Sequence, residues 1–247
     1  MNKIKFHYTY YILVLSFLLT GQFINLLIFT SLIVIHELGH YLSSKILNIE
    51  VKNITIYPYG GITKLNSVID IDLTKELIIS ISGIIMQTIY YFIIYILYKN
   101  NIIRPYVFEL FNKYHYSIVL FNLIPIYPLD GSKILNIIIN KVFNYKLSNI
   151  LLIILSIINI ILILFIFKFN YSFILILGIL INYLYNYLKN IKYIYNRFLL
   201  EKYLYKTKYQ NTRIIDNYNK MYRNTNHIIK NNKNYVKEED FLSKMFD

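Results

Sequence analysis

The sequence contains no cysteine, which excludes disulfide bonds, iron–sulfur clusters and any zinc site built on thiolates. A zinc ion would therefore need histidine and carboxylate ligands. Acidic residues are also scarce, with thirteen Asp and Glu in 247 residues. The regular alternation of apolar and polar residues that soluble domains show is missing too. Long apolar runs recur instead, 56% of the residues are hydrophobic, and the mean hydropathy is +0.44. These features predict a polytopic membrane protein.

The formal net charge of +13 does not indicate a nucleic-acid partner. Lysine and arginine residues lie between and after the apolar runs. This distribution is typical of residues that set membrane topology and that contact anionic lipid headgroups. No DNA- or RNA-binding motif accompanies them. We therefore expect no nucleic acid among the partners of this chain.

The apolar runs predict an all-α polytopic membrane protein of about six transmembrane helices. We place these spans at residues 6–20, 23–47, 77–98, 114–126, 147–167 and 171–188. Residues 1–188 would form the membrane domain. Residues 189–247 would be a basic cytoplasmic tail, with an amphipathic helix near 190–204. The polar chain that follows could be partly disordered or could form a small partner-binding element. An even number of spans and the positive-inside rule place both termini in the cytoplasm.

A short β-like loop is expected between the second and third spans. Alternating β-branched residues at 54–56 are followed by Pro58, Gly60 and Gly61. This order predicts a short strand and a turn.

The second span contains the motif His36-Glu37-Leu38-Gly39-His40. On a helix, two histidines four residues apart lie on one face and can bind a single zinc ion. The glutamate between them can then accept a proton from a water activated by the metal. A carboxylate within hydrocarbon costs roughly 2.5–3.5 kcal/mol on insertion scales, so its presence there indicates function.

Only one other acidic residue, Asp130, lies within the apolar body of the chain. It could be a third zinc ligand, or simply part of an Asp-Gly turn that caps a helix. The segment 122–131 favours a special role, because Pro125 and Pro128 interrupt a helix there and free backbone groups. Asn122 could offer its amide to a substrate strand or to a developing oxyanion.

The remaining histidines and an unusual glycine have structural interpretations. We expect His7 to be interfacial, and we assign no catalytic role to His115 or His227. Gly83, in the third span, is expected to permit close helix packing.

Taken together, the motifs at 36–40 and 122–131 resemble the site-2 protease family of intramembrane zinc metalloproteases. Segments 58–61, 108–111 and 197–201 resemble its bacterial stage IV sporulation group most closely. The resemblance implies one Zn²⁺ per chain and a defined set of site residues. These are the zinc ligands His36, His40 and Asp130, the catalytic base Glu37, and the substrate-binding residues Asn122, Pro128, Gly60 and Gly61.

The resemblance also implies an activity. The chain would be an intramembrane zinc metalloendopeptidase that cleaves a membrane-associated pro-protein, the pro-sequence of a sporulation sigma factor (pro-sigma-K). Such proteases lie in the bacterial membrane around the forespore, facing the mother cell, and are held inactive by two partner membrane proteins. The tail is too short for the complete nucleotide-sensing CBS domain of that group.

Two other functions fit some of these features. A non-proteolytic membrane transporter or metal-binding scaffold could have broken helices and buried carboxylates, although it would not require Glu37 between two histidines. Another membrane metalloprotease could have its site on the far side of the membrane and a different third ligand.

Overall fold

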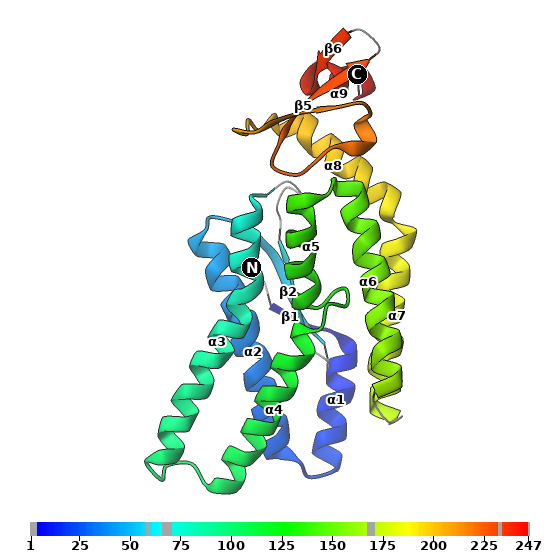
Figure 1. Cartoon of the computed structure of the whole chain (residues 1–247). Helices are drawn as coiled ribbons and strands as arrows, with labels where there is room; N and C mark the ends of the chain where they lie inside the picture. Colours follow the sequence, from blue (N-terminus) through cyan, green and yellow to red (C-terminus); the bar gives the residue numbers. More distant parts are fainter. Residues whose placement is uncertain (1–3, 58–59, 66–70, 167–170, 232–233, 247) are drawn as a thin grey trace. The chain divides into compact units, whose positions relative to one another are not determined.

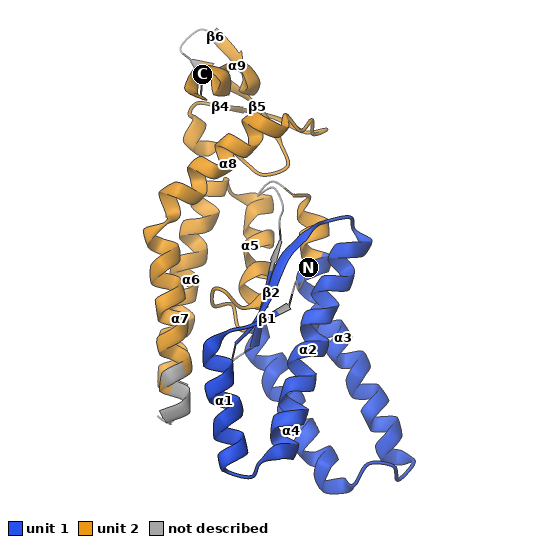
Figure 2. Cartoon of the chain, turned by 180° about the vertical axis from the view of Figure 1, so that it is seen from behind, with its two compact units in different colours: residues 1–67, 78–123 blue, residues 68–77, 124–247 orange. Residues whose placement is uncertain are grey.

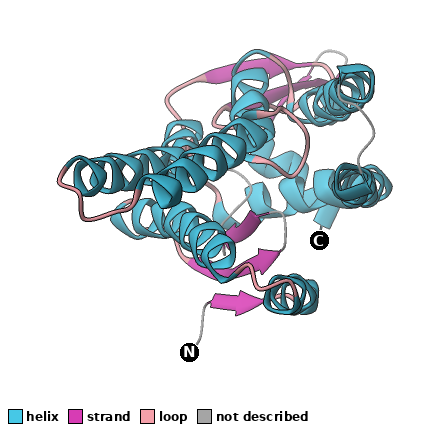
Figure 3. Ribbon diagram, turned by 90° about the horizontal axis from the view of Figure 1, so that it is seen from below, coloured by secondary structure: helices cyan, strands magenta, loops and turns pink. Residues whose placement is uncertain are grey.

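A computed structural model describes residues 4–57, 60–65, 71–166, 171–231 and 234–246 (Figure 1). The described part of the chain is mostly helical and contains nine α-helices and two small sheets. Its residues form two compact units, residues 1–67 with 78–123 and residues 68–77 with 124–247 (Figure 2). The prediction of an all-α chain was therefore too narrow, since the strands seen in Figure 3 accompany the helices.

The first unit consists of helices around one short sheet. Its elements are β1 (Ile4–Phe6), α1 (Tyr8–Leu19), α2 (Phe23–Ile46), β2 (Val51–Tyr57), β3 (Gly60–Leu65), most of α3 (Leu73–Lys99) and α4 (Pro105–Leu123). Helix α2 packs against α1 and α4 and also contacts β2 and β3. The core between these elements contains Leu32, Ile56 and Phe111. Helix α2 therefore lies at the centre of this unit.

The sheet of the first unit is the predicted β-like loop with one strand added. Strand β1 pairs with β2 in parallel, and β2 pairs with β3 antiparallel. Ile54 and Ile56 alternate with more exposed residues along β2, which is why one face of the strand is buried. Pro58 and Tyr59, at the predicted turn, lie outside the described residues.

Within the described residues, three helices are long and apolar enough to cross a membrane. They are α2, α3 and the segment Tyr145–Phe165 of α6. Their surfaces remain apolar, with Leu27 70% exposed and Ile96 57% exposed, which suits contact with lipid. Helix α1 is apolar but has only 12 residues, about 18 Å of helix, against about 30 Å of hydrocarbon. The protein is a multi-pass membrane protein with these three candidate spans.

The second unit combines helices with the C-terminal sheet. Its elements are α5 (Asp130–Val142), α6 (Tyr145–Ile166), α7 (Tyr171–Lys189), α8 (Ile191–Tyr205), β4 (Thr212–Ile215), the 3₁₀ helix η1 (Tyr218–Lys220), β5 (Asn226–Asn231), β6 (Asn234–Lys237) and α9 (Glu238–Phe246). Residues 68–77, with the start of α3, also belong to this unit. Helix α5 packs against α6, and α6 and α7 both pack on α8.

The described residues after α8 form a small sheet, a 3₁₀ helix and α9. Strand β4 pairs in parallel with β5, and β5 pairs antiparallel with β6. Ile215, Met221, Ile229 and Leu242 are buried together against Phe198 of α8. Few apolar residues are present in this stretch, but these four face one core, and α8 supplies the partner surface that the segment lacks alone.

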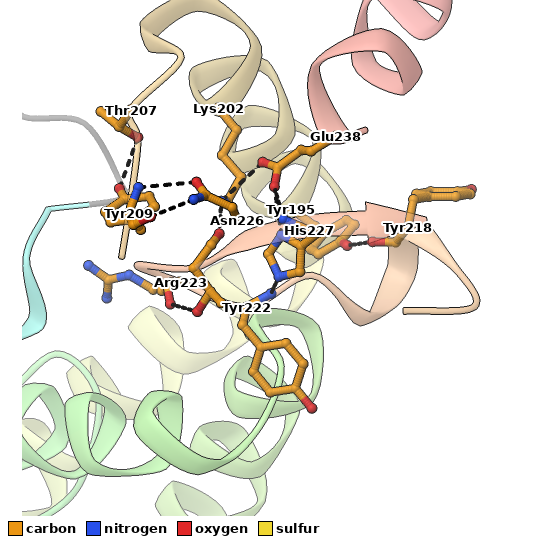
Figure 4. A network of polar contacts seen from close by, with 11 residues as sticks. Tyr195, Lys202, Thr207, Tyr209, Tyr218, Tyr222, Arg223, Asn226, His227 and Glu238 are labelled. Atoms are coloured by element: carbon orange, nitrogen blue, oxygen red, sulfur yellow. Dashed lines mark hydrogen bonds and ion pairs between the residues drawn. The ribbon is translucent and has the colours of Figure 1, made fainter. Parts of the chain in front are cut away.

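A polar network crosses this C-terminal core (Figure 4). Glu238 forms an ion pair with Lys202 at 3.1 Å, and its other carboxylate oxygen accepts from Nδ1 of His227 at 2.7 Å. Burial alone would raise the pKa of Glu238, but the hydrogen bond from His227 and the charge of Lys202 lower it below its usual value. The network therefore holds α8, β5 and the start of α9 together with an ionised carboxylate.

The same region also holds the start of α3. Asn224 accepts from the backbone N–H of Leu73 at 2.8 Å and donates to the carbonyl of Ile71 at 3.0 Å. The buried guanidinium of Arg223 forms an ion pair with Glu76 in the first turn of α3 at 2.8 Å. A residue distant in sequence thus caps this helix, satisfying a backbone donor that the helix itself cannot.

Candidate metal centre

Helix α2 places His36, Glu37 and His40 in the interior of the first unit. They are 3%, 4% and 2% exposed, respectively. The two histidines are one helical turn apart and on one face, as predicted. One ligand atom from each of the three residues lies within 4.8 Å of the others, so the group could hold a metal ion.

Each imidazole is oriented by an acceptor at its Nδ1 atom. Nδ1 of His40 lies 2.7 Å from the main-chain carbonyl of Ile79, which can only accept, so this nitrogen carries the proton. Nδ1 of His36 lies 3.1 Å from Oε1 of Gln87. With both Nδ1 atoms protonated, each neutral imidazole has its lone pair on Nε2.

The two Nε2 atoms lie 3.1 Å apart. Two neutral rings with protonated Nδ1 atoms cannot hydrogen-bond to each other through Nε2, because neither atom then carries a proton. A tetrahedral zinc ion with bonds of 2.0–2.1 Å would separate two nitrogen ligands by about 3.3 Å. The residues present therefore fit a zinc ion shared by the two Nε2 atoms.

Gly83 of α3 leaves the space that these rings occupy. A Cβ atom at this position would lie 2.5 Å from Nε2 of His40 and 2.7 Å from Nε2 of His36. The sequence predicted close packing at Gly83, and the close approach is to the two imidazoles. Gly39, the glycine of the His36–His40 motif, also allows α2 and α3 to lie close together, since a Cβ on it would collide with the carbonyl of Ser82.

Strand β3 covers the carboxylate of Glu37. Thr63 donates its hydroxyl hydrogen to Oε2 of Glu37 at 2.6 Å. A Cβ on Gly61 would overlap the Glu37 side chain, so only glycine allows the strand this close. Gly60, also predicted at the site, is buried and has φ = 149°, which side chains disfavour. The predicted loop thus contacts the predicted base through Gly61 and Thr63.

Asp130 lies in the second unit, at the first residue of α5, and is 4% exposed. The N-cap position is Leu129, so Asp130 is not the capping residue of this helix. Its Oδ1 atom accepts from Nζ of Lys133 at 2.8 Å. The carboxylate is therefore buried at a helix N-terminus, where negative charge is favoured.

Two further predicted residues flank the proline-containing loop. Asn122 is buried near the end of α4, and its Nδ2 donates to the carbonyl of Ile118 in the same helix at 3.1 Å. Pro128 follows a cis peptide bond from Tyr127. Helix α4 ends at Leu123 and α5 begins at Asp130, so the segment that contains the two prolines is not helical.

Sequence reasoning did not identify Gln87 or Thr63. The signal for Gln87 was present, because an amide in an otherwise apolar span needs a buried partner. Thr63 gave no such signal, since threonine is common in strands and only the strand's position next to α2 reveals its contact.

A buried His-Glu-x-x-His group on an apolar helix defines the class of zinc metalloproteases. Comparisons with known proteins agree. The sequence model of peptidase family M50 matches residues 24–115. Stage IV sporulation protein FB of Bacillus subtilis is 30% identical over 210 residues, covering 83% of this chain and 73% of that protein. The chain belongs to peptidase family M50, the site-2 proteases, and is a zinc metalloprotease of this type.

Two archaeal proteins are also similar. A zinc metalloprotease of Methanocaldococcus jannaschii is 30% identical over 125 residues, covering 49% of this chain and 35% of the relative. The solved structure of a site-2 protease from Methanocaldococcus jannaschii matches with a TM-score of 0.58 at 22% identity, covering 75% of this chain and 91% of that one. The fold is therefore that of a site-2 protease.

Proposed function

We propose that this chain cleaves a membrane-associated protein precursor, with pro-sigma-K, the precursor of a sporulation sigma factor, as its substrate. The observation that supports the proteolytic activity is the pair of buried histidine Nε2 atoms, which lie 3.1 Å apart beside Glu37. The likeness to a sporulation protein over 73% of its length supports this choice of substrate. We also propose that inhibitory membrane-protein partners control the enzyme.

The proposed metal centre is one zinc ion held by His36, His40 and Asp130. Asp130 is the one acidic residue of the apolar body besides Glu37, and the helix N-terminus and Lys133 beside it both favour the negative charge that a zinc ligand carries. Zinc, when bound, would act as a Lewis acid toward water and the scissile carbonyl. Three protein ligands leave one position open, as catalytic zinc sites do.

Glu37 would act as the general base and then as the general acid. It would accept a proton from the attacking water and return it to the leaving amine. The hydrogen bond from Thr63 holds Oε2. Oε1 is then the oxygen that would exchange the proton.

Substrate would bind as an extended strand, because the peptide bonds of a helix are shielded by their own hydrogen bonds. Strand β3 is at the edge of its sheet among the described residues, and an edge strand can pair with an added strand. Gly60 and Gly61 allow close approach there. Asn122 and Pro128 would complete the substrate-binding surface.

We propose six spans, with both termini in the cytoplasm and the enzyme in the membrane around the forespore. Helices α1, α4 and α7 would be the spans additional to the three long apolar helices. The tail from residue 189 onward would be a cytoplasmic module. The lack of native cysteine makes the topology easy to test, since Lys244→Cys should react with an impermeant maleimide only after the cells are opened.

The proposed function is tested by co-expression with pro-sigma-K. Wild type should shorten the precursor, whereas Glu37→Gln should not cleave it and should still contain zinc. Cleavage by the Glu37→Gln protein would exclude the base role. If the zinc-loaded wild type cleaves other membrane proteins but not pro-sigma-K, the assignment of pro-sigma-K as the substrate is refuted.

A further inference from the structure

Gln87 is a fully buried amide in the apolar helix α3, at 0% exposure. A primary amide has two donor hydrogens and an acceptor oxygen, and burying them without partners is costly. Its two ends contact different helices. Oε1 lies 3.1 Å from Nδ1 of His36 on α2, and Nε2 lies 3.3 Å from the carbonyl oxygen of His115 on α4.

The contact with His115 fixes which way the amide points. A main-chain carbonyl can only accept, so the NH₂ group of Gln87 must face His115. Oε1 then faces His36, and the proton between them belongs to Nδ1 of the imidazole. The assignment of oxygen and nitrogen in this amide thus follows from its chemistry, and it sets the tautomer of His36.

We propose that Gln87 is a positioning residue for the metal centre, which holds His36 in the tautomer and ring orientation that present the Nε2 lone pair to zinc. This inference rests on the zinc site in the proposed function. Gln87 would contact neither metal nor substrate. It would act through His36, and the carbonyl of His115 would in turn hold Gln87.

The two histidines are held in different ways, and this makes the proposal testable. His40 is oriented by a backbone carbonyl, that of Ile79, which no side-chain substitution removes. His36 is oriented by a side chain, so its acceptor can be removed or exchanged alone. Loss of a partner that orients a ligating histidine typically weakens metal binding about 10–100-fold.

Three substitutions separate the effect of the hydrogen-bond acceptor of Gln87 from the effect of its side-chain packing. Gln87→Met keeps the length and volume of the side chain but removes the strong acceptor. Gln87→Glu keeps an acceptor for Nδ1–H and loses the donors toward His115. Thr88→Val is the matched control on the next residue, because Thr88 hydrogen-bonds only to Ile84 of its own helix among the contacts observed for it.

The experiment measures zinc affinity of the detergent-solubilised full chain by competition with a chromophoric chelator. The visible absorption of the Co²⁺-substituted protein provides a second readout. Gln87→Met should bind zinc about 10–100-fold more weakly and change the Co²⁺ spectrum, while its melting temperature without metal matches wild type. Gln87→Glu and Thr88→Val should stay within about threefold of wild type.

Two results would overturn the proposal. One is equal zinc affinity in Gln87→Met and wild type. The other is weakening by Gln87→Glu as large as by Gln87→Met, which would assign the effect to the contact with His115 and not to the acceptor. Failure of wild type itself to bind zinc would instead refute the metal centre of the proposed function, so the two failures are distinguishable.

Discussion

Gly83→Ala should strongly weaken zinc binding although it adds only one methyl group. The new Cβ would lie 2.5 Å and 2.7 Å from the Nε2 atoms of His40 and His36, where ordinary contacts begin at 3.4 Å. The ring of His40 must therefore move by about 0.9 Å and that of His36 by about 0.7 Å, or α3 must shift away. Zinc–ligand distances tolerate deviations of only about 0.2 Å. We expect zinc affinity to fall at least about 100-fold, and cleavage to fall with it.

The same substitution at another glycine provides the control for Gly83→Ala. Gly178 also lies in an apolar helix, and a Cβ there would meet nothing within 4 Å. Gly→Ala raises helix propensity by up to about 1 kcal/mol at either position, so this contribution is shared. Zinc content would be measured by mass spectrometry of the purified proteins, and thermal stability in parallel. Gly83→Ala protein with one tightly bound zinc would refute the steric reasoning.

Three further predictions concern other contacts. Thr63→Val should lower kcat about 10-fold with little change in KM, because the hydroxyl holds Oε2 of Glu37. Thr63→Ser keeps the hydroxyl and should retain activity. Equal kcat in the two variants would contradict this role. Asp130→Asn should lose zinc, measured by metal analysis, whereas Lys133→Met should retain it; full zinc content in Asp130→Asn would exclude the ligand role. The folded-state pKa of Glu238 is lowered, so the stability it confers is complete above its unfolded pKa of about 4.3 and is lost as pH falls through the folded value. Glu238→Gln should therefore weaken the pH dependence of the stability of the C-terminal sheet at acid pH, as measured by hydrogen exchange. An unchanged acid transition would argue against this role.

The sequence was most informative where a residue type was out of place. Histidine and glutamate in an apolar helix are costly, so the motif at 36–40 could be assigned without coordinates. The interruption near Pro125 and Pro128 was predictable because proline cannot continue a helix. The C-terminal sheet was not predictable, because its apolar residues are few and acquire a common core only when α8 packs against them.

The sequence by itself determined the chemistry of the centre. The lack of cysteine, two histidines one helical turn apart and a carboxylate between them predict a metal site of nitrogen and oxygen ligands, which suits zinc. Tertiary structure decided how that centre is held. Gln87 and Ile79 orient the imidazoles, Gly83 leaves them room, and Thr63 donates to the carboxylate of Glu37. These contacts join α2 to other elements 26 to 51 residues away in the sequence. Periodicity along one helix specifies its own face, whereas the partners across that face are set by packing.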